Sequence, residues 1–524
     1  MDAETSPPAK TLKVQWKTPP RRSRGILRSL GPGLIIAGSI VGSGELVATT
    51  KTGAEAGFWL LWLIVIGCVI KVSVQIEFGR EAITHGEGTL GSLNQVPGPR
   101  LRVNWIVWYW LFMVMMSMAQ LGGIVGGVGQ ALAITSPLTS AGSEFNLYQD
   151  RITRREVLAA LVEPAGSKAA AANTGRMEML QGELQRLNAE LTATPLPPES
   201  QDDVIWALLL TIVTIFVLVR GRYRLVQTLA TILVATFTIV TVWNLFALQS
   251  LPEWRVTWAE FTRGLSFRLP PEAIAGVSPV ATAMAAFGII GVGASELVAY
   301  PYWCLEKGYA RWTGPREESS AWVERARGWI SVMHWDALLS AVVYTFATVA
   351  FYLLGAAVLG RAYLNPSGSQ MIRTLSEMYV PVFGETAPTI FLFGAISVLY
   401  STFFVASASH ARVMADALRV FGLVKKDEAT RKFWIRVFSG TTPAASFMVY
   451  VFVKAPVVLI LLSGVTQAIM LPMLAFSALY FRYRRCHAEL HPGRWWDFFL
   501  WLSCVSLMIA GVWAALTRIV PALG

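Results

Sequence analysis

Long apolar segments separated by short polar ones make up most of this 524-residue chain. Many of the apolar runs approach the roughly 20 residues that an α-helix needs to cross a bilayer. The pattern therefore predicts an all-α polytopic membrane protein with eleven transmembrane helices. The predicted spans cover residues 31–53, 57–79, 104–134, 204–219, 225–248, 279–304, 329–359, 387–410, 437–453, 455–481 and 496–518.

Two of these spans contain nearly the same eight residues. Val41–Ala48 reads VGSGELVA and Val292–Ala299 reads VGASELVA, so six of the eight positions agree. In both stretches small residues interrupt the apolar pattern, and a glutamate lies beside the interruption. A helix break at membrane depth is tolerated only where the freed backbone is buried in protein or lines a cavity. We therefore predict breaks in helices 1 and 6, near Gly42–Gly44 and Gly293–Ser295.

The two broken spans divide the chain into two halves of five helices each. Because each half contains an odd number of spans, the second half crosses the membrane in the opposite orientation. The prediction is a 5+5 inverted repeat with the substrate site between the breaks in helices 1 and 6. The eleventh helix is an addition to this repeat.

Charged residues are sparse and unevenly distributed. They make up 15% of the chain, against about 25% in a soluble domain. With a cytoplasmic N-terminus, 29 of the 44 lysines and arginines fall in cytoplasmic segments, as the positive-inside rule requires. The net charge of +11 is therefore attributed to membrane topology and not to a nucleic-acid partner. We predict a plasma-membrane protein in contact with lipid, in a bacterial inner membrane, with its C-terminus extracytoplasmic.

One polar segment interrupts the membrane part of the chain. Residues 139–203 hold ten acids and six bases, and apolar residues recur there at the alternating spacing of an amphipathic helix. These residues are Met177, Leu180, Leu184, Leu187 and Leu191. We predict an extracytoplasmic insertion, partly helical, that folds back on itself; an oligomer contact is the alternative, and the oligomeric state is left open. The other predicted parts are a basic cytoplasmic N-terminus (1–30), helices 1–3 (31–138), helices 4–10 (204–485), and helix 11 with the C-terminus (486–524).

The two glutamates beside the breaks, Glu45 and Glu296, are the strongest candidates for function. A carboxylate at membrane depth is costly and therefore marks a functional site by default. The breaks add oxygens from the backbone or hydroxyls of four further residues: Gly42, Ser43, Gly293 and Ser295. An all-oxygen shell suits hard divalent cations such as Mg²⁺, Ca²⁺ or Mn²⁺. Two alternatives stay open: a glutamate that only caps a half-helix, and a glutamate that carries a proton.

Four other polar residues within the apolar spans are further candidates. Asp336 in the seventh span is interpreted as a salt link or as a gate or proton relay. Gln120 and Gln467 are interpreted as interhelical hydrogen bonds or as parts of the same gate or relay. Lys71 in the second span is interpreted as snorkelling from a tilted helix or as neutralising Glu77, and the second interpretation is favoured. No phosphate-binding loop or catalytic motif is present, so we expect neither enzymatic activity nor a cofactor.

Several of these motifs, in their order and spacing, resemble the natural resistance-associated macrophage protein (Nramp) family. The resemblance rests on Gly31-Pro32-Gly33, the stretch Gly57–Trp62, Gly288–Gly291, Asp336, and Leu462–Val465 through Met470–Pro472. It covers about residues 28–135 and 204–485. It implies a LeuT-like fold and transport of a divalent metal ion, which would be the substrate.

The chain departs from the family at the residues that hold the metal. The family's Asp-Pro-Gly-Asn in helix 1 is Gly42–Glu45 here, and its Met-Pro-His in helix 6 is Ser295–Leu297. The metal-binding aspartate and methionine are therefore absent, and acids expected in the third span fall on Gln120 and Gly123. Since the sulfur ligand is lost, the departures favour a hard ion such as Mg²⁺ or Mn²⁺.

The function predicted from the sequence is therefore secondary transport of a divalent cation by alternating access. The ion would be bound between the unwound segments of helices 1 and 6. Two alternatives remain at this point: a transporter of a small organic solute on the same scaffold, and a membrane sensor that does not transport.

Overall fold

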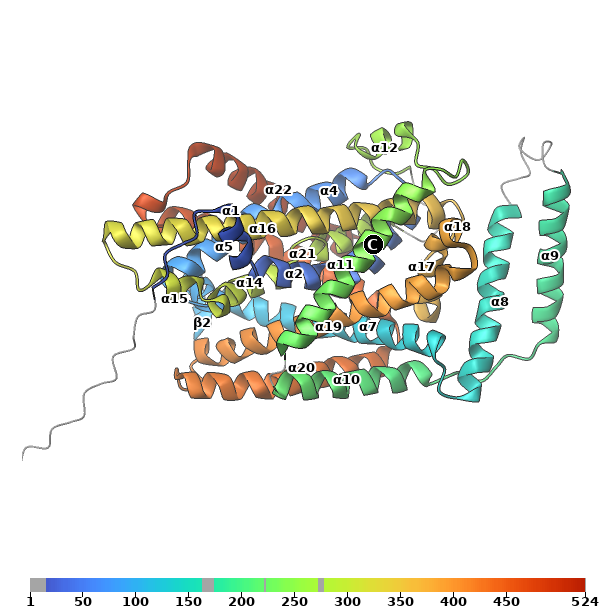
Figure 1. Cartoon of the computed structure of the whole chain (residues 1–524), viewed down its shortest axis with the longest axis horizontal. Helices are drawn as coiled ribbons and strands as arrows, with labels where there is room; N and C mark the ends of the chain where they lie inside the picture. The colour runs from blue at the N-terminus through green and yellow to red at the C-terminus, as the bar shows by residue number, and fades with distance from the viewer. Residues whose placement is uncertain (1–15, 163–173, 221–222, 272–277, 524) are drawn as a thin grey trace, which may run out of the picture.

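The broken helices and the helices around them form one elongated bundle (Figure 1). The computed structural model describes residues 16–162, 174–220, 223–271 and 278–523. Within these residues the fold is all-α except for a two-stranded antiparallel hairpin of β1 (Arg100–Leu101) and β2 (Val103–Asn104). The predicted all-α class is confirmed. Residues 1–15 of the predicted N-terminal part lie outside the described residues.

The first half of the repeat runs from the short helix α1 to α11. Its membrane helices and their connections are α1 (Ser23–Ser29), α2 (Pro32–Ile40), the π-helix η1 (Gly44–Thr49), α3 (Thr50–Ala56), α4 (Leu61–Val69), α5 (Lys71–His85), α6 (Thr89–Leu93), α7 (Trp105–Thr135), α10 (Asp202–Arg220) and α11 (Tyr223–Leu248). Two helices are inserted between α7 and α10, namely α8 (Ser140–Val162) and α9 (Thr174–Ala193).

The second half and the added helix follow α12 (Trp258–Gly264). Their elements are α13 (Pro279–Ile289), α14 (Ala294–Lys307), α15 (Tyr309–Thr313), α16 (Ser320–Leu354), the π-helix η4 (Gly355–Gly360), η5 (Gly368–Gln370), α17 (Met371–Ser376), η6 (Glu377–Tyr379), α18 (Val380–Phe383), η7 (Gly384–Thr386), α19 (Ala387–Val420), α20 (Glu428–Val453), α21 (Pro456–Tyr480), the π-helix η8 (Phe481–Arg485), η9 (Ala488–Leu490) and α22 (Arg494–Leu523).

Both predicted helix breaks are present. In helix 1, α2 ends at Ile40 and η1 begins at Gly44. In helix 6, α13 ends at Ile289 and α14 begins at Ala294. Gly291, between them, has φ +56°, a left-handed conformation that glycine adopts without steric cost. The prediction of broken helices 1 and 6 is therefore confirmed.

The count of eleven membrane helices is not confirmed. Within the described residues, eight helices are long and apolar enough to cross a membrane, and the Val234–Leu248 part of α11 is a shorter apolar stretch. The first span does not qualify by length because its break divides it into short pieces. Eleven spans therefore stay a prediction.

Close packing at glycines brings α21 against the break in helix 6. A Cβ atom on Gly288 of α13 would lie 1.9 Å from the carbonyl oxygen of Gly464 on α21. The two backbones therefore touch, which places Gln467, one turn further along α21, beside the break. Helix α21 also packs against α7, which in turn contacts α10, α19 and α20.

The inserted segment forms a pair of helices that stands at one end of the bundle, away from α1 and α15 (Figure 1). Leu158 of α8 and Leu187 of α9 are buried, and Arg154 pairs with Glu183 between the two helices. The segment thus folds back on itself. The side chain of Met177 lies outside the described residues, and the alternative of an oligomer contact is not tested.

Candidate functional site

The break in helix 1 is built around Gly42, which has no room for a side chain. A Cβ atom there would lie 1.9 Å from the hydroxyl oxygen of Thr402 on α19. That hydroxyl donates to the Ser39 carbonyl at 3.1 Å, and the Gly42 carbonyl accepts the Leu46 N–H at 2.8 Å. Gly42 therefore offers the site only backbone atoms, and its carbonyl already takes part in the following helix.

Glu45 is fully buried and connects the two breaks. Its Oε1 accepts the Gly291 N–H at 3.1 Å and the Thr348 hydroxyl at 3.4 Å, and its Oε2 accepts the Gly42 N–H at 3.3 Å. Glu45 therefore ties helix 1 to the break in helix 6 and to α16. Both oxygens already have donors, so a contact between Glu45 and a metal ion stays a prediction.

Glu296 lies in the first turn of α14. We call its carboxylate open, because it is not held by hydrogen bonds from other described residues. Its side chain is partly exposed, and within the described residues no other residue donates a hydrogen bond to it. A Cβ atom on Gly293 would lie 2.5 Å from Glu296 Oε2, 3.1 Å from Gln467 Oε1 and 3.2 Å from the Gly288 carbonyl oxygen. Three oxygens therefore converge beside the α-carbon of Gly293.

A chain of neutral polar side chains joins the two breaks. Gln120 of α7 donates to the Ser43 hydroxyl at 3.2 Å and accepts from the Gln467 amide at 2.8 Å. Gln467 in turn accepts the Ser295 N–H at 3.0 Å, and the Ser295 hydroxyl lies 3.0 Å from the Ser117 hydroxyl. The structure thus brings Gln120 and Gln467 to the predicted ion-binding residues. A part for them in gating or proton relay stays a prediction.

A small chamber of about 20 Å³ lies against Glu296. This volume holds about one water molecule. Besides Glu296 and Ser295, its walls include His410 of α19 and Trp110 and Met113 of α7. We call this space the Glu296 chamber. It combines one carboxylate, one imidazole and one thioether.

Sequence reasoning missed His410 and Met113 as site residues. Both lie in long apolar helices, and neither is part of a recognisable motif. The only signal for His410 is that the chain contains five histidines and that His410 is one of two, with His334, that fall within a predicted apolar span.

Asp336 holds the start of helix 1 in place. Its Oδ1 accepts the Gly31 N–H at 2.8 Å, and its Oδ2 accepts the Gly33 N–H. The side chain is fully buried and so satisfies N–H groups that helix α2 leaves unpaired at its N-terminal end. The structure places Asp336 as a cap between α16 and α2, at the other end of α2 from the break.

We expect the substitution Asp336→Ala to lower the free energy of unfolding by about 2 kcal/mol, because two buried N–H groups lose their acceptor. Thermal unfolding of purified protein in detergent would measure the loss. Asp336→Asn retains one acceptor oxygen and should lose less. If Asp336→Asn instead unfolds like the wild type but changes the pH dependence of uptake, a proton relay is the better explanation.

The donors at the breaks are mostly neutral. The described part of the chain contains no group of three or more His, Cys, Asp or Glu side chains that could hold a metal ion. A cation here would therefore depend on one open carboxylate, Glu296, supplemented by amide, hydroxyl and backbone oxygens.

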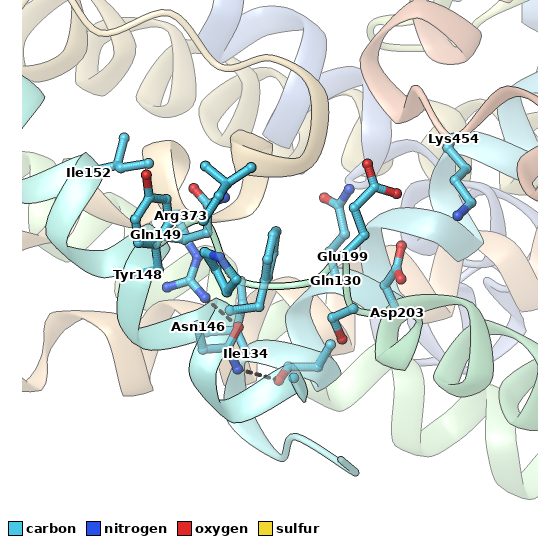
Figure 2. Close-up of a pocket in the computed structure, with 16 residues that line it drawn as sticks. Gln130, Ile134, Asn146, Tyr148, Gln149, Ile152, Glu199, Asp203, Arg373 and Lys454 are labelled. Carbon is cyan, nitrogen blue, oxygen red and sulfur yellow. Dashed lines mark hydrogen bonds between the residues drawn. The ribbon is translucent and has the colours of Figure 1, made fainter. Parts of the chain in front are cut away.

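A larger pocket of about 430 Å³ lies where the inserted helices meet the bundle (Figure 2). Arg373 of α17 donates to Asn146 of α8 at 2.5 Å and also pairs with Asp150. Asn146 donates to the Ala133 carbonyl near the end of α7 at 2.8 Å. None of the predicted site residues lines this pocket. Its polar contacts fasten α8 to the bundle.

Comparison with known proteins agrees with this architecture. A family model described as natural resistance-associated macrophage protein-like (Nramp) matches residues 193–517. No curated protein matches the chain. Among solved structures, the manganese transporter of Eremococcus coleocola superimposes with a TM-score of 0.61, over 98% of this chain and 92% of that one, both as a histidine-to-alanine mutant at 13% identity and in complex with an aromatic bis-isothiourea substituted compound at 14% identity.

Identities this low demonstrate a shared fold and nothing about the substrate. The sequence resemblance, by contrast, is confirmed by the family model, which covers more than half of the chain. This integral membrane protein therefore belongs to the Nramp-like family.

Proposed function

We propose that this protein is a secondary transporter of divalent metal cations that works by alternating access. The observation that carries the proposal is Glu296, an open carboxylate beside the break in helix 6, joined through glutamines to the break in helix 1. Unwound segments of this kind bind substrates and ions in transporters built from inverted repeats. Membership of the Nramp-like family and a fold shared with a manganese transporter support the same function.

The donors favour a hard divalent ion, and among these Mn²⁺ over Mg²⁺. Carboxylate, amide and hydroxyl oxygens suit Mg²⁺, Ca²⁺ and Mn²⁺ alike. The Glu296 chamber adds His410 and Met113, whose nitrogen and sulfur favour transition metals. A chamber of about 20 Å³ has room for an ion in this conformation but not for an organic solute, which makes the organic alternative less favoured.

Isothermal titration calorimetry of the purified protein with Mn²⁺, Mg²⁺ and Ca²⁺ tests the proposal. We expect saturable binding with Mn²⁺ ahead of Mg²⁺, and a smaller gap between the two ions in His410→Ala. Uptake into proteoliposomes should follow the same order. Binding without uptake would favour a sensor, and no binding of any of the three ions would contradict the proposal.

We also propose a plasma-membrane location with a cytoplasmic N-terminus, as the distribution of basic residues favours. The α8–α9 pair would then be extracytoplasmic, because it stands at the opposite end of the bundle from α1 (Figure 1). Labelling of single cysteines in intact cells, one in α8 and one near α15, would decide the orientation.

A further inference from the structure

Lys71 contacts backbone carbonyls that were not predicted as its partners. It is fully buried at the start of α5, and its ammonium donates to the carbonyls of Phe287 at 2.5 Å and Ile290 at 2.8 Å. The ammonium also lies 4.8 Å from the centre of the Phe287 ring. Glu77, the partner predicted from the sequence, pairs instead with Arg80 at 3.0 Å, so that prediction was wrong.

The carbonyls that Lys71 contacts belong to the C-terminal end of α13. The last carbonyls of a helix have no intrahelical donor and carry the negative end of the helix dipole. In transporters with discontinuous helices, such half-helix ends and unwound carbonyls coordinate the coupling cation. Here a side chain of the protein itself supplies the positive charge.

Lys71 and Glu45 hold opposite ends of a single peptide bond. The carbonyl of Ile290 accepts from Lys71 at 2.8 Å, and the N–H of the next residue, Gly291, donates to Glu45 at 3.1 Å. We call this arrangement the peptide clamp. It joins three helices, because Lys71 comes from α5, Glu45 from η1 and the peptide from the break in helix 6.

A buried basic group and a buried acidic group that bond to one peptide depend on each other. Removing one leaves the other buried without compensation, which costs far more than removing both. The remaining ionisable groups near the clamp are Glu296, Cys68 and Tyr344, whose hydroxyl donates to the Cys68 carbonyl at 3.3 Å. Glu45 and Glu296 are therefore the acidic groups that can balance Lys71.

We propose that Lys71 is a positioning residue whose ammonium occupies a monovalent-cation site at the C-terminal end of α13. With Glu45 it fixes the shape of the break in helix 6. Because the ammonium cannot leave, the site needs no sodium or potassium ion to be filled. The consequence for transport rests on the proposed function: uptake of a divalent cation by this protein is independent of sodium and potassium.

The test is thermal unfolding of full-length protein in detergent, in sodium, methylammonium or choline chloride at equal ionic strength. We expect the wild type to unfold at the same temperature in all three. Lys71→Ala should unfold about 5 °C lower in choline and recover part of that loss in sodium or methylammonium, which can enter the vacated site. The double variant Lys71→Met/Glu45→Gln should be more stable than Lys71→Met alone, since no buried charge is left unpaired.

Lys51 provides a matched control. It is also buried, at 8% exposure, and pairs with Glu55 at 2.9 Å away from the breaks. Lys51→Ala should lose stability equally in all three salts. The proposal is overturned if Lys71→Ala unfolds like the wild type, or if its loss is the same in sodium, methylammonium and choline. Failure of the wild type to take up any divalent ion would contradict the proposed function alone, because the unfolding measurements do not depend on transport.

Discussion

Replacing Glu296 by glutamine is expected to weaken Mn²⁺ binding about 100-fold or more and to abolish measurable uptake. Glu296 is the one open carboxylate that the structure places at the chamber, and within the described residues nothing else donates a hydrogen bond to it. Glutamine keeps the size of the side chain and one acceptor oxygen but removes the negative charge. Titration calorimetry would give the affinity, and Mn²⁺ uptake into proteoliposomes would give the rate.

A suitable control is Glu306→Gln, on the same helix. Glu306 pairs with Arg412 at 2.6 Å near the end of α14, away from the chamber, so this substitution should leave Mn²⁺ affinity within about twofold of the wild type, as expected for a surface pair. If Glu296→Gln binds Mn²⁺ like the wild type, Glu296 does not contact the ion and the location of the site is wrong.

Glu45→Gln should behave differently from Glu296→Gln, although both residues were predicted as ligands. The substitution removes the acidic end of the peptide clamp and leaves Glu296 as the acidic group that can balance Lys71, so the principal effect should be on the unfolding temperature. Its effect on affinity should be smaller than that of Glu296→Gln. A large loss of affinity with an unchanged unfolding temperature would show that Glu45 binds the ion directly.

The local sequence was sufficient to predict where the helices break. Glycine and serine within an apolar span are visible without knowledge of the fold, and the near-identical octamers at Val41–Ala48 and Val292–Ala299 mark both breaks. The inverted repeat followed from their position in the chain. The different environments of the two glutamates were not predictable, because the octamers surrounding Glu45 and Glu296 are nearly the same.

What the sequence could not indicate depends on contacts between distant helices. His410 and Met113 reach the Glu296 chamber only because α19 packs against α14 and because Ser117 of α7 contacts Ser295 of α14. Glu77 follows Lys71 by six positions in the sequence, yet the hydrogen-bond acceptors of Lys71 are backbone carbonyls more than 200 positions away. A carbonyl carries no residue-type signal, so no pattern of side chains could have revealed this contact.

The second large effect is expected from Gly42→Asp, which restores the aspartate that the family resemblance places in helix 1. A side chain at position 42 would have its Cβ atom 1.9 Å from the Thr402 hydroxyl oxygen and 2.8 Å from the Thr402 Cβ atom. Overpacking of this kind, with a buried carboxylate added, should cost roughly 3 kcal/mol or more. We expect a strong fall in the unfolding temperature and no uptake.

Removing the obstacle should reverse part of this loss. Thr402→Ala deletes the hydroxyl and methyl groups that fill the break, and by itself it should cost about 1 kcal/mol for the hydrogen bond to the Ser39 carbonyl. The double variant Gly42→Asp/Thr402→Ala should therefore unfold at a higher temperature than Gly42→Asp alone, a non-additive result expected for residues in contact. If the two substitutions are simply additive, Thr402 does not exclude the aspartate. If they are coupled, the absence of the family's aspartate is explained by α19 packing into the break, and this chain depends on Glu296 for its charge.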